Sequence, residues 1–352
     1  MKTMVKKVFG MIVITLLMGL FAACGSPKSD EGSEATLPKE INFGVMQLPN
    51  DETLAISEGL FDKYFTEKGI KCNFINFDSG SDVIAALASN SIDFGVIGSS
   101  PATIALALGI DVEMIWIHEV LGEIESLAVR EGSGIDTVED LIGKKIATPV
   151  ASTAHYSLLN GLKNAGIADK VEILDMQPLS IVAAWDRGDI DATYVWQPAL
   201  GDILGKNGKI MFSSADVAAQ GAVTSNVEVV SKKFSEKYPD LVTSYIACML
   251  EAGDLYRENP EKVSEVMAKA LEITPEDALT QMKGSIWLTL DEALSENYFG
   301  TSENKGKLAK IMKETGDFLK EQKSIEEVPS QDAFNAYVNS MYLEKAKTLL
   351  NK

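Results

Sequence analysis

The chain has 352 residues, of which 46% are hydrophobic, enough apolar material for one large or two medium-sized domains. Its formal net charge of −19 at pH 7 excludes nucleic-acid binding, because the phosphate backbone requires a basic surface. The two histidines have no cysteine or carboxylate at metal-ligand spacing, so we expect no metal site and no cofactor.

The N-terminus has the organisation of a bacterial export signal. A lysine-rich start precedes an apolar run over 8–23, shorter than the ~20 residues that span a bilayer. The run ends in Phe21-Ala22-Ala23-Cys24, which resembles a lipobox with Phe in place of the usual Leu. We therefore expect a lipoprotein signal peptide over 1–23, a lipid on Cys24 and a flexible tether over 24–39. Such a protein would lie on the outer face of the bacterial cytoplasmic membrane.

Beyond the tether, short apolar strands alternate with helices, which favours parallel sheets covered on both sides. The first four strands are expected at 41–46, 72–77, 92–97 and 112–117. After Gly122 the pattern restarts, with strands at 125–130, 145–148, 171–174 and 191–195. A strand at 227–230 indicates a return crossing, and the rest of the chain is nearly all helical. We expect a first lobe of 40–121 and 228–352 and a second lobe of 122–227, joined by a hinge.

One pattern occurs twice, 98 residues apart (181 − 83 = 98), at 83–93 and 181–191. Each copy predicts a helix, a small turn, the residues Ile-Asp and then a strand. The first strand leads into Gly98-Ser99-Ser100-Pro101, which predicts a turn, an N-cap serine and a proline at the first helical position. Two unrelated units of common composition are one interpretation. The other is a pair of related lobes whose helix starts face a shared cleft and suit a small anion.

Five motifs are more specific than the strand pattern. They are DSG at 78–80, IDFGVIGSSP at 92–101, STAHYSLL at 152–159, IVAAWDRGDIDATYVWQPA at 181–199 and FLKEQ at 318–322. Together they resemble the solute-binding component of taurine ABC importers, over nearly the whole chain from Ile41 to about Tyr342.

The resemblance implies the α/β type II periplasmic-binding-protein fold, with two lobes, a central cleft and a hinge, and extra C-terminal helices. It also implies a monomer that is not an enzyme, which captures taurine or a similar small sulfonate and delivers it to an ABC permease with its ATPase. The wider group takes up sulfonates, nitrate and related small anions, so a binding protein for alkanesulfonates or another small anion is the alternative.

A sulfonate is a permanent anion with three oxygens, so it needs hydrogen-bond donors and no acceptor. The donors that we expect are Ser79, Ser99, Ser100, Thr153 and Ala154, with His155 as a further one. For each of them the alternative is a helix cap or a local contact without a ligand.

The ammonium of a taurine-like ligand would need a carboxylate and an aromatic face. Glu125 and Trp196 offer both, and the first exit loop adds Gln47 and Asp51, although Asp51 would serve equally well at a helix start. The resemblance implies an Asp near the return crossing, where this chain has Asn226, so an amine-free ligand stays open.

Two further questions stay open at this stage. An enzyme on the same fold is the rival from another class, but His118 and His155 have no evident catalytic companions in the sequence. Cys72 and Cys248 are expected to be buried thiols, with a disulfide between them as the alternative.

Overall fold

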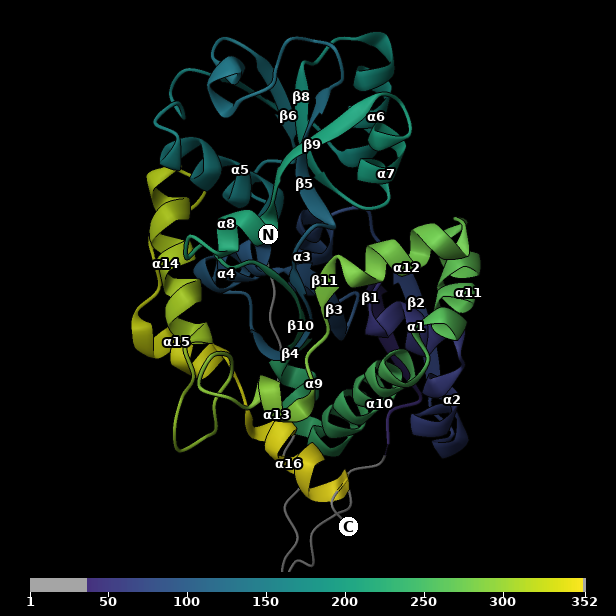
Figure 1. Cartoon of the computed structure of the whole chain (residues 1–352). Helices are drawn as coiled ribbons and strands as arrows, with labels where there is room; N and C mark the ends of the chain where they lie inside the picture. The colour runs from purple at the N-terminus through teal and green to yellow at the C-terminus, as the bar shows by residue number, and fades with distance from the viewer. Residues whose placement is uncertain (1–36, 351–352) are drawn as a thin grey trace, which may run out of the picture. The chain divides into compact units, whose positions relative to one another are not determined.

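A computed structural model describes residues 37–350, which form two α/β lobes, each built on its own sheet (Figure 1). The expected signal peptide and Cys24 lie outside the described residues. Among residues 37–350, no helix combines the length and the apolar character that crossing a bilayer requires.

The first lobe is built on a six-stranded sheet in the order β11-β4-β10-β3-β1-β2. Its strands are β1 (Glu40–Val45), β2 (Lys71–Asn76), β3 (Phe94–Gly98), β4 (Val112–Leu121), β10 (Ser225–Ser231) and β11 (Ser285–Ile286). β1 runs parallel to β2 and β3, whereas β10 lies antiparallel between β3 and β4. The expectation of a purely parallel sheet is therefore wrong, because the chain returns from the second lobe and enters this sheet from the opposite end.

The second lobe has a five-stranded sheet in the order β7-β6-β8-β5-β9. Its strands are β5 (Glu125–Arg130), β6 (Lys145–Thr148), β7 (Glu172–Asp175), β8 (Ala192–Trp196) and β9 (Gly208–Ser213). β6 is parallel to β7 and β8, and β5 is antiparallel to β8 and β9. β9 is an edge strand that was not expected, because only Ile210, Met211 and Phe212 mark it as apolar in the sequence.

Helices cover both sheets. Before the return crossing they are α1 (Asp51–Ser57), α2 (Leu60–Tyr64), α3 (Gly80–Ala88), α4 (Ser99–Ala107), α5 (Thr153–Asn164), α6 (Pro178–Arg187), α7 (Ala199–Leu204) and α8 (Ser214–Ala218). After it they are α9 (Lys232–Lys237), α10 (Pro239–Glu258), α11 (Pro260–Leu271), α12 (Pro275–Lys283), α13 (Leu290–Ala293), α14 (Leu308–Glu321), α15 (Gln331–Tyr337) and α16 (Met341–Leu350). α10 begins with Pro239 at its first helical position, where a proline is favoured, and it buries an apolar stripe.

The repeated segment folds in the same way in both lobes, as α3 followed by β3 and as α6 followed by β8. In the first copy, Asp93 Oδ2 accepts the Asn42 N–H at 2.9 Å, and the Asp93 N–H donates to the Asn42 carbonyl at 2.8 Å. In the second copy, Asp191 makes the same two bonds with Lys145, at 2.9 and 3.0 Å. Each Asp thus fixes a neighbouring parallel strand, which gives the recurring Ile-Asp a structural reason.

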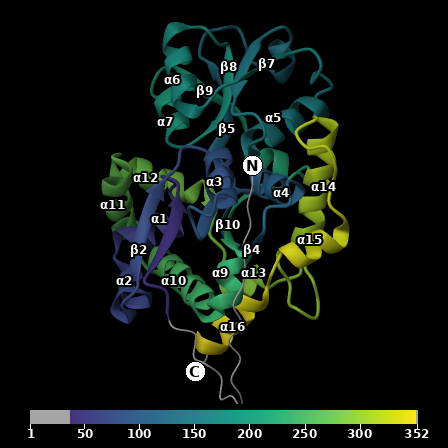
Figure 2. The same cartoon turned by 180° about the vertical axis from the view of Figure 1, so that it is seen from behind.

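α14 lies beside both lobes, as Figures 1 and 2 show from opposite sides. It packs against α4 of the first lobe. Its Phe318 and Leu319 belong to the hydrophobic core of the second lobe, where the Phe318 ring meets Tyr156 edge-on with centroids 4.8 Å apart. Cys72 is half-buried and Cys248 buried, and both are free thiols.

The Asp contacts predict a difference between the two lobes. Asp93→Ala should lower the free energy of unfolding by about 1 to 2 kcal/mol, because the Asn42 N–H loses its acceptor in a partly buried place. Asp191→Ala should cost less, because its bond with Lys145 is exposed. Urea titrations measure both. The Asn variants keep the oxygen and serve as controls, and equal costs for Asn and Ala would contradict the proposed role of that oxygen.

Candidate functional site

A cavity lies between the lobes, where strand ends and helix starts meet. Its volume is about 30 Å³, room for about two water molecules in this conformation. The residues that line it include Met46, Leu48, Gly80, Gly98 and Asn226 from the first lobe, and Glu125, Thr153 and Trp196 from the second.

The starts of α3, α4 and α5 meet at the cavity, and at two of them the neighbouring residues are so close that glycine is required. A Cβ on Gly98, the N-cap of α4, would lie 2.8 Å from Cγ2 of Thr153 at the start of α5. A Cβ on Gly80, the first residue of α3, would lie 2.9 Å from the Pro101 ring. The first N–H groups of a helix have no intrahelical acceptor and lie at the positive end of its dipole. These helix starts therefore favour an anion in the cavity.

The expected N-cap serine of α4 is wrong. The helix begins at Ser99, after Gly98 in an extended conformation, and no side chain caps it. Pro101 is tolerated at the third helical position because the N–H groups of the first turn have no intrahelical acceptor in any case.

None of the three expected serine hydroxyls lines the cavity. Ser79 caps α3, and its hydroxyl donates to Asp82 Oδ2 at 2.7 Å. The Ser99 hydroxyl accepts the Ser225 N–H at 3.4 Å, and the Ser100 hydroxyl is fully buried without a partner. The structure thus brings the helix starts to the cavity but turns these hydroxyls away from it.

The start of α5 is used differently from what the sequence predicts. Thr153 lines the cavity, but its hydroxyl donates to Glu125 Oε2 at 2.6 Å. Ala154 is fully buried and does not line the cavity. His155 faces its own loop, where Nδ1 accepts the Ala151 N–H at 3.3 Å, and burial lowers its pKa.

Glu125 and Trp196 lie directly opposite each other in the antiparallel β5–β8 pair. Residues in such a pair point to the same face, so both side chains reach the cavity. Trp196 also lines a second, outer cavity of about 300 Å³, which it shares with the exposed Gln47.

Glu125 is a buried carboxyl group, only 1% exposed, without a cationic partner among the described residues. The Ser214 hydroxyl donates to its Oε1 at 2.7 Å, and Thr153 occupies its Oε2. Burial raises the pKa of Glu125 to about 7, although these hydroxyls pull it down. A cation in the cavity would favour the ionised form of Glu125.

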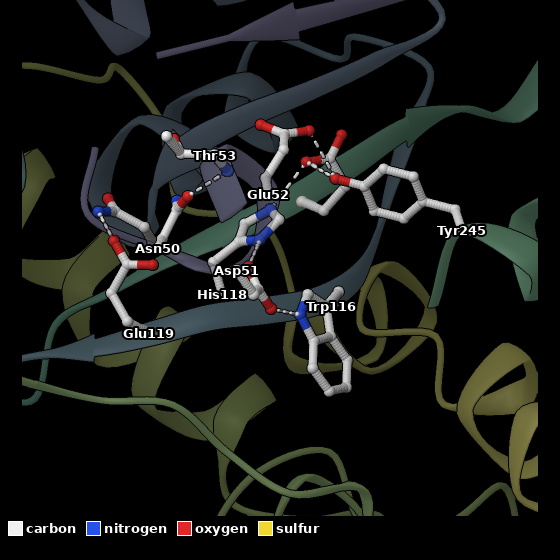
Figure 3. Close-up of polar contacts among 10 residues, drawn as sticks. Asn50, Asp51, Glu52, Thr53, Trp116, His118, Glu119 and Tyr245 are labelled. Carbon is white, nitrogen blue, oxygen red and sulfur yellow. Dashed lines mark hydrogen bonds and ion pairs between the residues drawn. The ribbon is translucent and has the colours of Figure 1, made fainter. Parts of the chain in front are cut away.

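Asp51 does not reach the cavity; it is 2% exposed and belongs to a network in the core of the first lobe (Figure 3). Its Oδ2 accepts from Trp116 Nε1 at 2.8 Å, and its Oδ1 lies 2.5 Å from His118 Nδ1. His118 Nε2 lies 2.9 Å from Glu228 Oε2. Burial alone would lower the pKa of His118, but Asp51 and Glu228 raise it well above its usual value, so the imidazolium donates from both nitrogens.

The same network continues to α10. The Tyr245 hydroxyl lies 2.8 Å from Glu52 Oε1 and 3.0 Å from Glu228 Oε2 (Figure 3). Burial and the charge of Glu228 raise the pKa of Glu52 to about 8, so Glu52 is protonated at neutral pH. His118 therefore has acidic companions, which sequence spacing could not reveal because Asp51 and Glu228 lie 67 and 110 residues away.

Glu52, His118 and Glu228 are also the one group within residues 37–350 whose atoms could hold a metal ion, lying within 4.8 Å of one another. Their arrangement has another explanation, because His118 bonds Glu228 directly and Tyr245 bridges the two glutamates. Shared protons thus account for the contacts among these three groups.

Asn226 lines the cavity from β10 and is 9% exposed. Its Nδ2 donates to Oε1 of Glu119, the neighbouring residue on β4, at 2.6 Å. Sequence reasoning missed Glu119, because its importance depends on the pairing of two strands far apart in the chain.

Comparisons with known proteins agree with this architecture. Residues 61–263 match the family model described as NMT1/THI5 like. The chain is 38% identical over 285 residues to the taurine-binding periplasmic protein of Escherichia coli (strain K12), covering 79% of this chain and 85% of that protein.

Solved structures match the fold. The periplasmic aliphatic sulphonate binding protein SsuA from Escherichia coli matches with a TM-score of 0.69 and 22% identity, over 84% of this chain and 92% of that one. The desulfurization enzyme DSZB matches with a TM-score of 0.60 and 16% identity, over 89% and 100%. Both likenesses show the fold alone, and a fold shared by a binding protein and an enzyme does not decide between capture and catalysis.

The buried network predicts how stability depends on pH. Folded Glu52 keeps its proton up to a pKa of about 8, whereas the unfolded chain releases it near 4.5, so the folded state holds more protons between these values. The free energy of unfolding should therefore fall as pH rises through this window, by at most about 1.4 kcal/mol per pH unit from this group.

Glu52→Gln imitates the protonated form and should flatten this decline, which urea titrations from about pH 5 to 8 would measure. Glu58→Gln, an exposed change at the opposite end of the same helix, serves as the control and should follow the wild type. Parallel pH profiles for Glu52→Gln and the wild type would rule out Glu52 as the source.

Proposed function

The chain belongs to the NMT1/THI5-like family, and from this membership and the interlobe cavity we propose that it is the extracytoplasmic binding protein of an ABC importer. Its ligand in this proposal is taurine or a similar small sulfonate, which it delivers to the membrane permease with its ATPase. The similarity to the taurine-binding periplasmic protein supports both the class and the ligand.

The single observation that carries the ligand is Glu125. Leaving a carboxylate in a buried wall costs free energy unless a cation compensates it, and no described side chain does so. A ligand ammonium would provide that charge, and the indole of Trp196 on the adjacent strand offers it an aromatic face. Taurine supplies the ammonium, whereas a simple alkanesulfonate does not.

The opposite end of the ligand suits the helix starts. The sulfonate oxygens require donors, and the first N–H groups of α3, α4 and α5 supply them without bringing a proton acceptor. In this proposal the ligand is held by backbone N–H groups at one end and by Glu125 at the other. The hydroxyls of Ser79, Ser99 and Ser100 take no part in this proposal, because none of these serines lines the cavity.

Capture requires movement, because a cavity of about 30 Å³ has no room for taurine as it stands. We propose that the lobes rotate about the two crossings between the sheets, of which the return crossing ends at Ser225, where β10 enters the sheet of the first lobe, and not at 228. A ligand that touches both lobes would then favour the closed arrangement.

The alternative ligand, an alkanesulfonate, is favoured by one observation: the residue of β10 that lines the cavity is the neutral Asn226 and not a carboxylate that would attract an amine. Catalysis on the same fold is less well supported, because His118 is committed to a buried network and His155 to its own loop. We further propose that the protein acts as a monomer anchored by lipid on Cys24, which lies outside the described residues.

Calorimetric titration should show that taurine binds more tightly than ethanesulfonate, which keeps the sulfonate and lacks the amine. Glu125→Gln should weaken taurine by about 2 to 5 kcal/mol and change ethanesulfonate little, because only the amine meets this carboxylate. The taurine affinity of the wild type should also fall below about pH 7, where Glu125 takes up a proton at its raised pKa.

The Glu125→Gln variant is the control for the pH dependence of the wild type, because it has no carboxyl group at this position to titrate. If ethanesulfonate binds the wild type as tightly as taurine, and Glu125→Gln does not distinguish them, the amine is not recognised and the alkanesulfonate alternative replaces taurine.

Anchoring is tested separately. Cys24→Ala should leave the protein unlipidated, so that it is released from the membrane fraction or keeps its signal peptide. Cell fractionation and the intact mass of the mature protein measure this, and Cys72→Ala, which removes a half-buried thiol, should behave as wild type. A Cys24→Ala protein that stays in the membrane at the wild-type mass would refute the lipobox hypothesis.

A further inference from the structure

We propose that Glu119 is a positioning residue, which holds the Asn226 amide so that its carbonyl oxygen faces the cavity and accepts from the ligand's ammonium. This inference rests on the proposed function, because it concerns the amine end of the same ligand. It gives the first lobe an acceptor opposite Glu125 and therefore makes the amine a link between the lobes.

The hydrogen bond between the two side chains sets the direction of the amide. An ionised carboxylate only accepts, so the end of Asn226 that approaches Glu119 Oε1 at 2.6 Å must be its NH₂ group. The carbonyl oxygen of the same amide is then left for the cavity, and no bond among the described residues uses it. Without Glu119 the amide could turn over and present a donor, which would oppose an ammonium.

The backbone holds this pair in place. Asn226 lies opposite Glu119 of β4 on one side and opposite Gly98, the cap of α4, on the other. Glu119 is fully buried, so its carboxyl group has no water with which to exchange the Asn226 bond. The amide is thus fixed between a buried carboxylate and the helix start that favours the ligand's anion.

The buried network supports Glu119 from behind. Glu119 follows His118 on β4 and lies beside Asn50, the N-cap of α1, at one end of the network in Figure 3. Burial raises the pKa of Glu119 to about 7, and the charge of His118 together with the Asn226 bond favours the ionised, accepting form. Through the charge of His118, the buried network therefore helps to keep Glu119 in the form that accepts from Asn226 in the cavity wall.

The pair also explains why an Asp at 226 would not simply add a useful charge. Asn226→Asp places a second carboxylate against Glu119, and two close carboxylates tend to share one proton. Exchanging both residues, Glu119→Gln with Asn226→Asp, keeps a hydrogen bond between them and moves the negative charge to the cavity side.

The experiment compares taurine with ethanesulfonate by calorimetry at about pH 7.5, where the ratio of the two dissociation constants reports recognition of the amine. Glu119→Leu should reduce the preference for taurine at least about tenfold, because the amide loses its orientation. Asn226→Asp alone should not raise the preference, whereas the double exchange should raise it to the wild-type value or above.

Glu113→Leu is the matched control. Glu113 is also a buried carboxylate on β4 that accepts from an asparagine amide, Asn339 Nδ2 at 2.7 Å, but it does not line the cavity. The change should leave the taurine preference unaltered even if it lowers stability. If Glu119→Leu does not fold, the comparison of Asn226→Asp with the double exchange carries the test.

The outcomes separate the two proposals. A folded Glu119→Leu that keeps the wild-type preference for taurine overturns the inference and leaves the proposed function standing. An Asn226→Asp variant that gains as much preference as the double exchange also overturns the inference. A wild type without any preference for taurine overturns the amine site itself and the inference with it.

Discussion

Buried carboxyl groups with few cations to match them are the constraint on which the first lobe and the cavity both depend. In the core of the first lobe, His118 compensates the charges of Asp51 and Glu228 by donating to both, and Glu52 keeps its proton and stays neutral. At the cavity, Glu125 has only hydroxyl donors, and its charge is left without a partner. In the core the cost of desolvation is offset by bonds within the protein, whereas at Glu125 it is offset only in part.

The positive side of the cavity comes from the backbone and not from side chains. α4 and α5 begin within contact of each other, and Gly98 allows this because any side chain there would collide with Thr153. A protein of net charge −19 can attract a small anion in this way, because helix dipoles and free N–H groups act locally. One cavity is therefore lined both by helix starts, which favour an anion, and by the carboxyl group of Glu125.

The two lobes share one structural contact near the cleft. Asp93 and Asp191 each fix a neighbouring parallel strand through paired backbone bonds, so the strand that follows each Asp ends at the cleft. α14 then contributes to both lobes, since it packs on α4 while Phe318 and Leu319 enter the second core. Any rotation of the lobes must accommodate this shared helix.

The sequence alone determined what depends on neighbouring residues. The bounds of β5 and β6 and the repeated helix-strand units follow from local periodicity. Glu125 and Trp196 could be named as a pair because each stands at the end of a recognisable strand. The tertiary structure decided the antiparallel direction of β10, the inward turn of Asp51 and the serine hydroxyls, and the contact of Glu119 with Asn226. These features join residues that lie far apart in the chain, such as Ser99 and Ser225 at 126 positions, and their energies depend on burial, which no local pattern contains.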